Sequence, residues 1–266
     1  MNLNFYQISY DFSPYDVWSS LVINSVSDGD DTFDSLKEKS NYHFDTTVDD
    51  LELIGTNKTP IIPVCRFKGQ WDADVKALSK LSQSSFIVKR SSGDKQLADY
   101  AKWGYDAEHS VADRTIIKNG LTDPNDSLRE DAKPFIKKIQ KTLGILPLSV
   151  RLDVQKPGQC FYWHIDNFVG MIRKANRVLP IELDQTKLVR FIVFLEDQGI
   201  GHHWQQGNLI LKWKKGDCFI WPWRDIPHGT ANFGHTNRPT LNITGTVTDK
   251  TLEFFKYAAL QKHIQI

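Results

Sequence analysis

Two histidines and one aspartate have the residue types and the spacing of a metal site. His164, Ile165 and Asp166 end one strand-like segment, and His228 lies on a second one further along the chain. Because alternate residues of a strand share a face, His164 and Asp166 can reach one ion while Ile165 faces away. Two imidazoles and one carboxylate leave three positions of an octahedral ion open, as in iron(II) oxygenases. We expect iron here, with a four-coordinate zinc site of a hydrolase as the alternative.

A polar strand after His228 favours iron over zinc. Arg238, Thr240, Asn242 and Thr244 alternate with apolar residues, so strand geometry places all four on one face. A guanidinium can hold a carboxylate through two hydrogen bonds, and the hydroxyl of Thr240 can add a third. The distal carboxylate of 2-oxoglutarate fits these donors, whereas a zinc hydrolase has no need of them. We therefore expect Arg238 and Thr240 to bind this co-substrate.

The same residues, in this order, resemble the motif of a known enzyme superfamily. The motif is His164-x-Asp166, His228 and Arg238-x-Thr240. It is similar to that of the Fe(II)/2-oxoglutarate-dependent dioxygenases, whose fold is a double-stranded β-helix. The resemblance in fold covers about residues 147–250 and does not extend to the N-terminal half of the chain.

Some features resemble particular branches of this superfamily. Arg151-Leu152, Pro157-Gly158 and the stretch 190–197 are similar to the phage-type branch and to relatives of the aspartyl/asparaginyl hydroxylases. Asp166 differs from true aspartyl hydroxylases, which lack this ligand, and from halogenases, which have a small residue in its place.

The resemblance also implies a reaction and its cofactors. Fe(II), O2 and 2-oxoglutarate would serve to hydroxylate a C–H bond of a protein side chain, an amino acid or a small metabolite. Succinate and CO2 would be released.

Two other functions remain open from the sequence. A cupin-like metalloenzyme that does not use 2-oxoglutarate would keep the three ligands and use Arg238 structurally. A jelly-roll binding module would keep the fold without the metal, and the three ligand residues would then form a hydrogen-bonded structural trio. Iron binding separates the module from the enzymes, and dependence on 2-oxoglutarate separates the two enzymes.

The segments that must position these residues are strand-like after Pro147. Period-two or β-rich runs cover residues 148–155, 160–166, 187–196, 208–213, 217–223 and 238–248. Turn residues separate these runs, and no regular helices alternate with them. We therefore predict a mainly β protein whose catalytic core, residues 146–250, is a double-stranded β-helix of the jelly-roll or cupin-like kind.

The segments on either side of this core have mixed or helical patterns. Residues 1–145 predict an α+β region that caps the barrel and shapes the substrate site. Within it, apolar residues at helical spacing predict a helix over 131–143, with Pro134 in its first turn and Gly144 as its end. Residues 251–266 predict a C-terminal helix that packs on the core.

Several polar residues near the motif have alternative interpretations. Tyr162 shares a face with His164 and can donate to 2-oxoglutarate, or it is a half-buried strand aromatic. Asn232 can be a pocket amide, but its position before Phe-Gly favours a turn residue. His202 and His203 are expected on a solvated loop.

Two arginines lie on the predicted strands. Arg190 stands in an apolar run and needs an anionic partner, which we expect to be Asp153 or Glu196, with the substrate as the alternative. Arg151 is open to the same two interpretations.

The overall composition excludes some partners. The 33 basic and 32 acidic residues nearly cancel, so no strong field gathers nucleic acid or an anionic membrane. The three cysteines, Cys65, Cys160 and Cys218, are far apart, which argues against a disulfide framework. With neither a signal-like start nor a long apolar run, we expect a cytoplasmic protein acting on a small molecule or a protein side chain.

Overall fold

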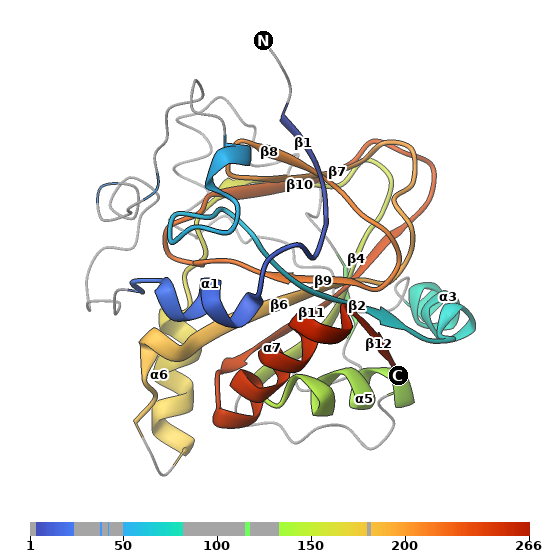
Figure 1. Cartoon of the computed structure of the whole chain (residues 1–266). Helices are drawn as coiled ribbons and strands as arrows, with labels where there is room; N and C mark the ends of the chain where they lie inside the picture. The colour runs from blue at the N-terminus through green and yellow to red at the C-terminus, as the bar shows by residue number, and fades with distance from the viewer. Residues whose placement is uncertain are drawn as a thin grey trace.

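Two β-sheets face one another and form the core of the computed structural model (Figure 1). The structure describes residues 4–23, 38, 42, 50–81, 115–117, 133–179 and 182–266. Within this part of the chain, no helix is both long and apolar enough to cross a membrane.

The larger sheet has the strand order β12-β2-β9-β6-β11-β4-β3. Its strands are β2 (Ile62–Lys68), β3 (Thr115–Ile117), β4 (Leu146–Gln155), β6 (Leu188–Phe194), β9 (Asp217–Ile220), β11 (Arg238–Thr246) and β12 (His263–Gln265). All neighbours are antiparallel except β12 and β2, which are parallel. The strand β11 is therefore central, with β4 on one side and β6 on the other.

The smaller sheet has the order β1-β8-β7-β10-β5. Its strands are β1 (Asn4–Gln7), β5 (Cys160–His164), β7 (His202–Gln206), β8 (Leu209–Lys212) and β10 (His228–Asn232). From β4 to β11 the chain passes repeatedly between the two sheets, which gives an eight-stranded jelly roll. The predicted double-stranded β-helix core is confirmed.

Helices cover the outer face of the larger sheet (Figure 1). They are α1 (Pro14–Ser20), α3 (Asp72–Leu81), α5 (Pro134–Leu143) and α7 (Asp249–Gln261). Helix α6 (Val169–Val178) instead packs Ile172 and Ala175 in the second apolar cluster, which lies between the sheets, and 3-10 turns lie at Asp50–Leu53 and Gln185–Lys187. Phe255 of α7 and Leu143 of α5 share one apolar cluster with Leu241 and Ile243 of β11. Because β11 alternates, this packing turns its polar residues toward the opposite sheet.

The predicted elements agree with the structure in position and differ at their ends. Each of the six predicted strands overlaps a strand of the structure, and the predicted C-terminal helix corresponds to α7. The helix predicted over 131–143 begins at Pro134, because Lys133 is its extended N-cap, while residues 131 and 132 lie outside the described part. Helix α6 was not predicted, and β12 follows α7 where only helix was expected.

The described parts of the N-terminal region contribute to both sheets. Strand β1 pairs with β8, and β2 lies between β9 and β12. These strands extend the sheets at their edges, so this region shares the architecture of the core. Its predicted role as a cap over the barrel stays a prediction.

A buried aspartate joins these added strands to the core. Asp217 is fully buried and accepts hydrogen bonds from the Tyr10 hydroxyl (2.5 Å), Arg66 Nε (2.6 Å) and the backbone N–H of Lys214 (2.7 Å). Three donors therefore satisfy this buried charge, and two of them come from the N-terminal region.

Replacing Asp217 should destabilise the protein strongly. Asp217→Ala leaves Arg66 and Tyr10 without their acceptor, and breaking a buried pair of this kind costs about 3 kcal/mol of unfolding free energy. Asp72 pairs with Lys215 at 2.6 Å and is exposed, so Asp72→Ala should cost less than about 1 kcal/mol. Urea unfolding measures both; equal losses would show that the Asp217 cluster contributes no special stability.

Candidate metal centre

The structure brings the three predicted metal ligands together. His164 ends β5 and His228 begins β10, and these antiparallel neighbours place the two residues directly opposite one another. Their ring centroids are 4.3 Å apart. Asp166 follows β5 by two residues, and one ligand atom from each of the three residues lies within 4.8 Å of the others.

The spacing and burial of these atoms suit a divalent ion. The Nε2 atoms of His164 and His228 lie 3.9 Å from Asp166 Oδ1 and Oδ2, respectively. Ligands of a six-coordinate ion, at bonds of about 2.1 Å, lie about 3 Å apart, so small side-chain rotations close the site. Asp166 Oδ2 is buried and has no hydrogen-bond partner among the described residues. A cation would satisfy this buried oxygen, so the donor set fits a metal.

Aromatic side chains and one carbonyl fix the ring of His228. Its Nδ1 lies 3.4 Å from the carbonyl oxygen of Ile226 and must donate there, which leaves the lone pair of Nε2 for an ion. The ring of Trp221 contacts it at 4.9 Å between centroids, and Trp204 lies parallel to it at 6.3 Å.

Arg238 lies at the start of β11, with its guanidinium tied to the strand that carries His228. Its Nε and Nη2 donate to Gln155 Oε1 at 3.1 and 2.6 Å, and Gln155 Nε2 donates to Thr230 Oγ1 at 3.1 Å. The guanidinium carbon lies 5.3 Å from the ring centroid of Trp204. Trp204 therefore lies close to both the Arg238 guanidinium and the His228 imidazole.

A polar strip runs along the inner face of the larger sheet. On β11 it comprises Arg238, Thr240, Asn242 and Thr244, which pair with Gln155, Asp153, Arg151 and Ser149 of β4, respectively. Thr240 and Asp153 are both buried. Asn242 Nδ2 donates to Asp153 Oδ2 at 2.6 Å, and Arg151 Nη2 lies 3.9 Å from the same oxygen. Of the two interpretations of Arg151, the internal ion pair is the one the structure contains.

Arg190 also has an internal partner, but a different one from those expected. Its Nη1 donates to Asp166 Oδ1 at 2.8 Å, so the prediction of Asp153 or Glu196 as partner is wrong. Glu196 is six residues further along the chain, about 20 Å in an extended strand, which is beyond the reach of Arg190. Arg190 of β6 pairs with Thr244 of β11. Asp153 of β4 pairs with Thr240, which is four residues away from Thr244 along β11.

The remaining candidates have separate outcomes. Tyr162 lies on β5, but its side chain is outside the described part of the structure, so its role stays a prediction. Asn232 is the last residue of β10, and its side chain supports the turn that follows, because its Oδ1 accepts from the backbone N–H of Gly234 at 3.0 Å and its Nδ2 donates to the Thr236 carbonyl at 2.7 Å. The expected solvated loop at His202 and His203 is wrong, because both belong to β7 and His202 is buried.

Gln155 and Trp204 were not among the predicted site residues. A signal for Gln155 was present, because it continues the alternation of polar residues along β4. Nothing in the sequence distinguished Trp204 from the other tryptophans on strands, since its place beside His228 depends on the pairing of β7 with β10.

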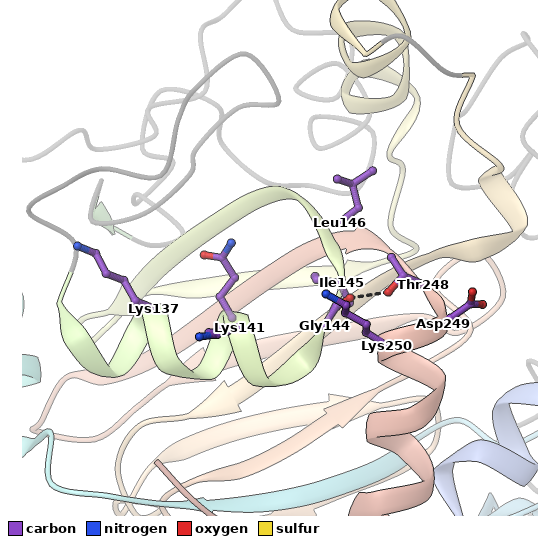
Figure 2. A pocket seen from close by; sticks show the side chains of 9 residues that line it. Lys137, Lys141, Gly144, Ile145, Leu146, Thr248, Asp249 and Lys250 are labelled. Atoms are coloured by element: carbon purple, nitrogen blue, oxygen red, sulfur yellow. Dashed lines mark hydrogen bonds between the residues drawn. The ribbon is translucent and has the colours of Figure 1, made fainter.

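A cavity of about 770 Å³ lies elsewhere, between the end of α5 and the start of α7 (Figure 2). Lys137, Lys141 and Lys250 line it, and Thr248 donates to the carbonyl of Gly144 at 2.6 Å beside it. No metal-ligand residue contributes to its lining. This cavity is therefore separate from the candidate metal centre.

His202 should make stability depend on pH. Its Nδ1 accepts from the Gly199 N–H and its Nε2 donates to the Thr236 carbonyl, both at 3.1 Å, which only a neutral ring can do. Burial lowers the pKa of His202, and the nearby charge of Arg238 lowers it further. The unfolded chain therefore binds the proton more readily, so this stabilisation is complete above about pH 6.5 and is lost as the pH falls through the folded-state pKa.

His202→Gln should reveal this dependence. At pH 7.5 the variant should lose about 1–2 kcal/mol of unfolding free energy, because two buried hydrogen bonds weaken. The difference from the wild type should shrink at pH 5, where the native histidine also becomes protonated. Urea unfolding at both pH values measures it, and a difference independent of pH would contradict the neutral-ring assignment.

Comparison with known proteins gives similarity in structure alone. No protein-family model matches the chain, and no curated protein matches it. Among solved structures, it is similar to the viral collagen prolyl hydroxylase vCPH of Paramecium Bursaria Chlorella virus-1 in its 2OG complex, at 15% identity and a TM-score of 0.35. That alignment covers 58% of this chain and 92% of the other.

Two further structures are similar over a larger share of the chain. A prolyl-4-hydroxylase of Pseudomonas putida has 13% identity and a TM-score of 0.38, covering 71% of this chain and 93% of the other. The alpha-ketoglutarate-dependent carbocyclase SnoK from nogalamycin biosynthesis has 11% identity and a TM-score of 0.41, covering 70% of this chain and 79% of the other. The similarity to all three proteins is one of low sequence identity and low TM-score.

Proposed function

We propose that this protein is an iron(II)- and 2-oxoglutarate-dependent oxygenase that hydroxylates a C–H bond. The observation that carries the proposal is the convergence of His164, Asp166 and His228 beside a buried arginine at the start of β11. Two imidazoles and one carboxylate suit iron(II) and leave three positions for other ligands.

Arg238 is linked to the strand that carries His228. Its guanidinium donates to Gln155, which donates to Thr230, two residues from His228 along β10. A five-carbon dicarboxylate that binds the metal by one end can extend toward this arginine. Arg238 can then hold the far carboxylate, and the buried hydroxyl of Thr240 lies on the same face to assist.

With iron, 2-oxoglutarate and dioxygen bound, such a centre supplies the oxidation that yields succinate and CO2 and places one oxygen atom in a substrate C–H bond. The side chains of the protein orient these ligands and keep water away. Trp204, Trp221 and Phe194 are buried and form an apolar cluster beside His228. This packing favours a dry site, in which charged contacts to a bound dicarboxylate are stronger than in water.

The two alternatives from the sequence make different predictions about ligands. A cupin-like enzyme would bind iron without 2-oxoglutarate, and a binding module would bind neither. The buried Asp166 Oδ2, which has no hydrogen-bond donor in the described part of the chain, favours a site that takes a cation. We propose a protein side chain, an amino acid or a small metabolite as the substrate.

Anaerobic titration of the iron(II)-loaded protein with 2-oxoglutarate tests the proposal. A weak visible metal-to-ligand charge-transfer band should appear as the 2-oxo acid chelates the metal. Arg238→Met should weaken 2-oxoglutarate binding about 100-fold, since two charge-assisted hydrogen bonds are lost, while iron binding stays intact. His228→Ala should greatly weaken iron binding, and Arg173→Met, at an exposed position of α6, should behave as the wild type.

The other outcomes identify the alternatives. Iron binding without the band would support the cupin-like enzyme, and failure to bind iron would support the binding module. Unchanged 2-oxoglutarate affinity in Arg238→Met would show that the buried Arg238 does not bind this co-substrate.

A further inference from the structure

Arg190 is held next to the candidate metal centre by two other segments of the chain, the residues that follow β5 and the strand β11. It extends from β6, its Nη1 donates to Asp166 Oδ1 at 2.8 Å, and its Nε donates to Thr244 Oγ1 of β11 at 3.0 Å. Its guanidinium carbon lies 4.4 Å from the ring centroid of Phe168, which precedes α6. The side chain is 14% exposed, so these contacts define its position.

The two oxygens of Asp166 therefore differ in their surroundings. Oδ1 accepts the hydrogen bond from Arg190, and the bond is charge-assisted and short. Oδ2 lies 3.9 Å from His228 Nε2 and has no hydrogen-bond donor among the described residues. Oδ1 is therefore occupied by a hydrogen bond from the protein, and Oδ2 can bind an ion.

We propose that Arg190 is a positioning residue that keeps Asp166 a one-oxygen metal ligand. Carboxylates bind metals through one oxygen or through two, and the second mode would occupy a further position of the ion. By holding Oδ1, Arg190 keeps that position open for the co-substrate or dioxygen. This inference rests on the proposed function, in which three positions of the ion stay open for other ligands.

The geometry also explains why an arginine is needed. A guanidinium has several N–H donors in a fixed plane, so it can bond Asp166 and Thr244 together while its face packs on Phe168. A lysine ammonium keeps the charge but cannot reproduce this planar arrangement. Arg190→Lys should therefore restore only part of what Arg190→Met removes.

The test compares Arg190→Met, Arg190→Lys and the wild type as full-length proteins. Anaerobic iron(II) titration should show binding about 10- to 100-fold weaker in Arg190→Met, as is typical when the partner of a metal ligand is removed, with an intermediate loss in Arg190→Lys. The cobalt(II)-loaded proteins give a second readout, because the visible absorption of cobalt(II) depends on its coordination. The cobalt spectrum of Arg190→Met should differ from that of the wild type.

A matched control separates positioning from stability. Arg66 forms an ion pair of the same kind with Asp217, at 2.6 Å, on β2 and β9, which carry no metal ligand. Arg66→Met should lower the thermal unfolding midpoint without changing iron affinity or the cobalt spectrum. If Arg190→Met fails to fold, Thr244→Val is the alternative variant, because it removes the hydrogen bond from Arg190 Nε to Thr244 Oγ1. Iron binding should then weaken, but by less than is expected for Arg190→Met.

Each result decides between the two proposals. Unchanged iron affinity and an unchanged cobalt spectrum in folded Arg190 variants would overturn the positioning role and leave the proposed function in place. A wild-type protein that binds no iron would overturn both.

Discussion

Asp166 is a carboxylate that is 5% exposed and lies beside two imidazole rings, and an anion in such a place requires positive charge beside it. Arg190 supplies that charge to Oδ1, and Oδ2, 3.9 Å from His228 Nε2, has no hydrogen-bond donor among the described residues and can bind an ion. The placement of β5, β6 and β10 follows this requirement. Strands from both sheets must meet around one charged group.

The two-faced character of the central strands makes this possible. Leu241 and Ile243 of β11 pack with the helices on the outer face, while its polar residues face the smaller sheet. The outer apolar cluster therefore contributes much of the folding energy, together with the apolar cluster that includes Phe194 and Trp221 between the sheets, since buried apolar area is the main stabilising contribution. The inner face can then carry polar side chains that a single-layered core would not tolerate.

Local patterns in the sequence predicted those parts of the site that depend on neighbours along a single strand. His164 and Asp166 share a face because of the period of a strand, and the same alternation predicts the polar face of β11. The partner of Arg190 could not be predicted, because the segment after β5 must turn back before it reaches β6. Strand β7 was missed because its polar sequence, His-His-Trp-Gln-Gln, becomes buried only through pairing with β8 and β10.

Strands far apart in the sequence form one edge of the larger sheet, where β12 lies parallel to β2 and β2 pairs with β9. Such distant pairings form slowly, because a long loop must close before the contacts are made. During synthesis, β2 therefore has no strand partner until β9 and β12 have been made, and its unpaired edges invite aggregation until those partners emerge.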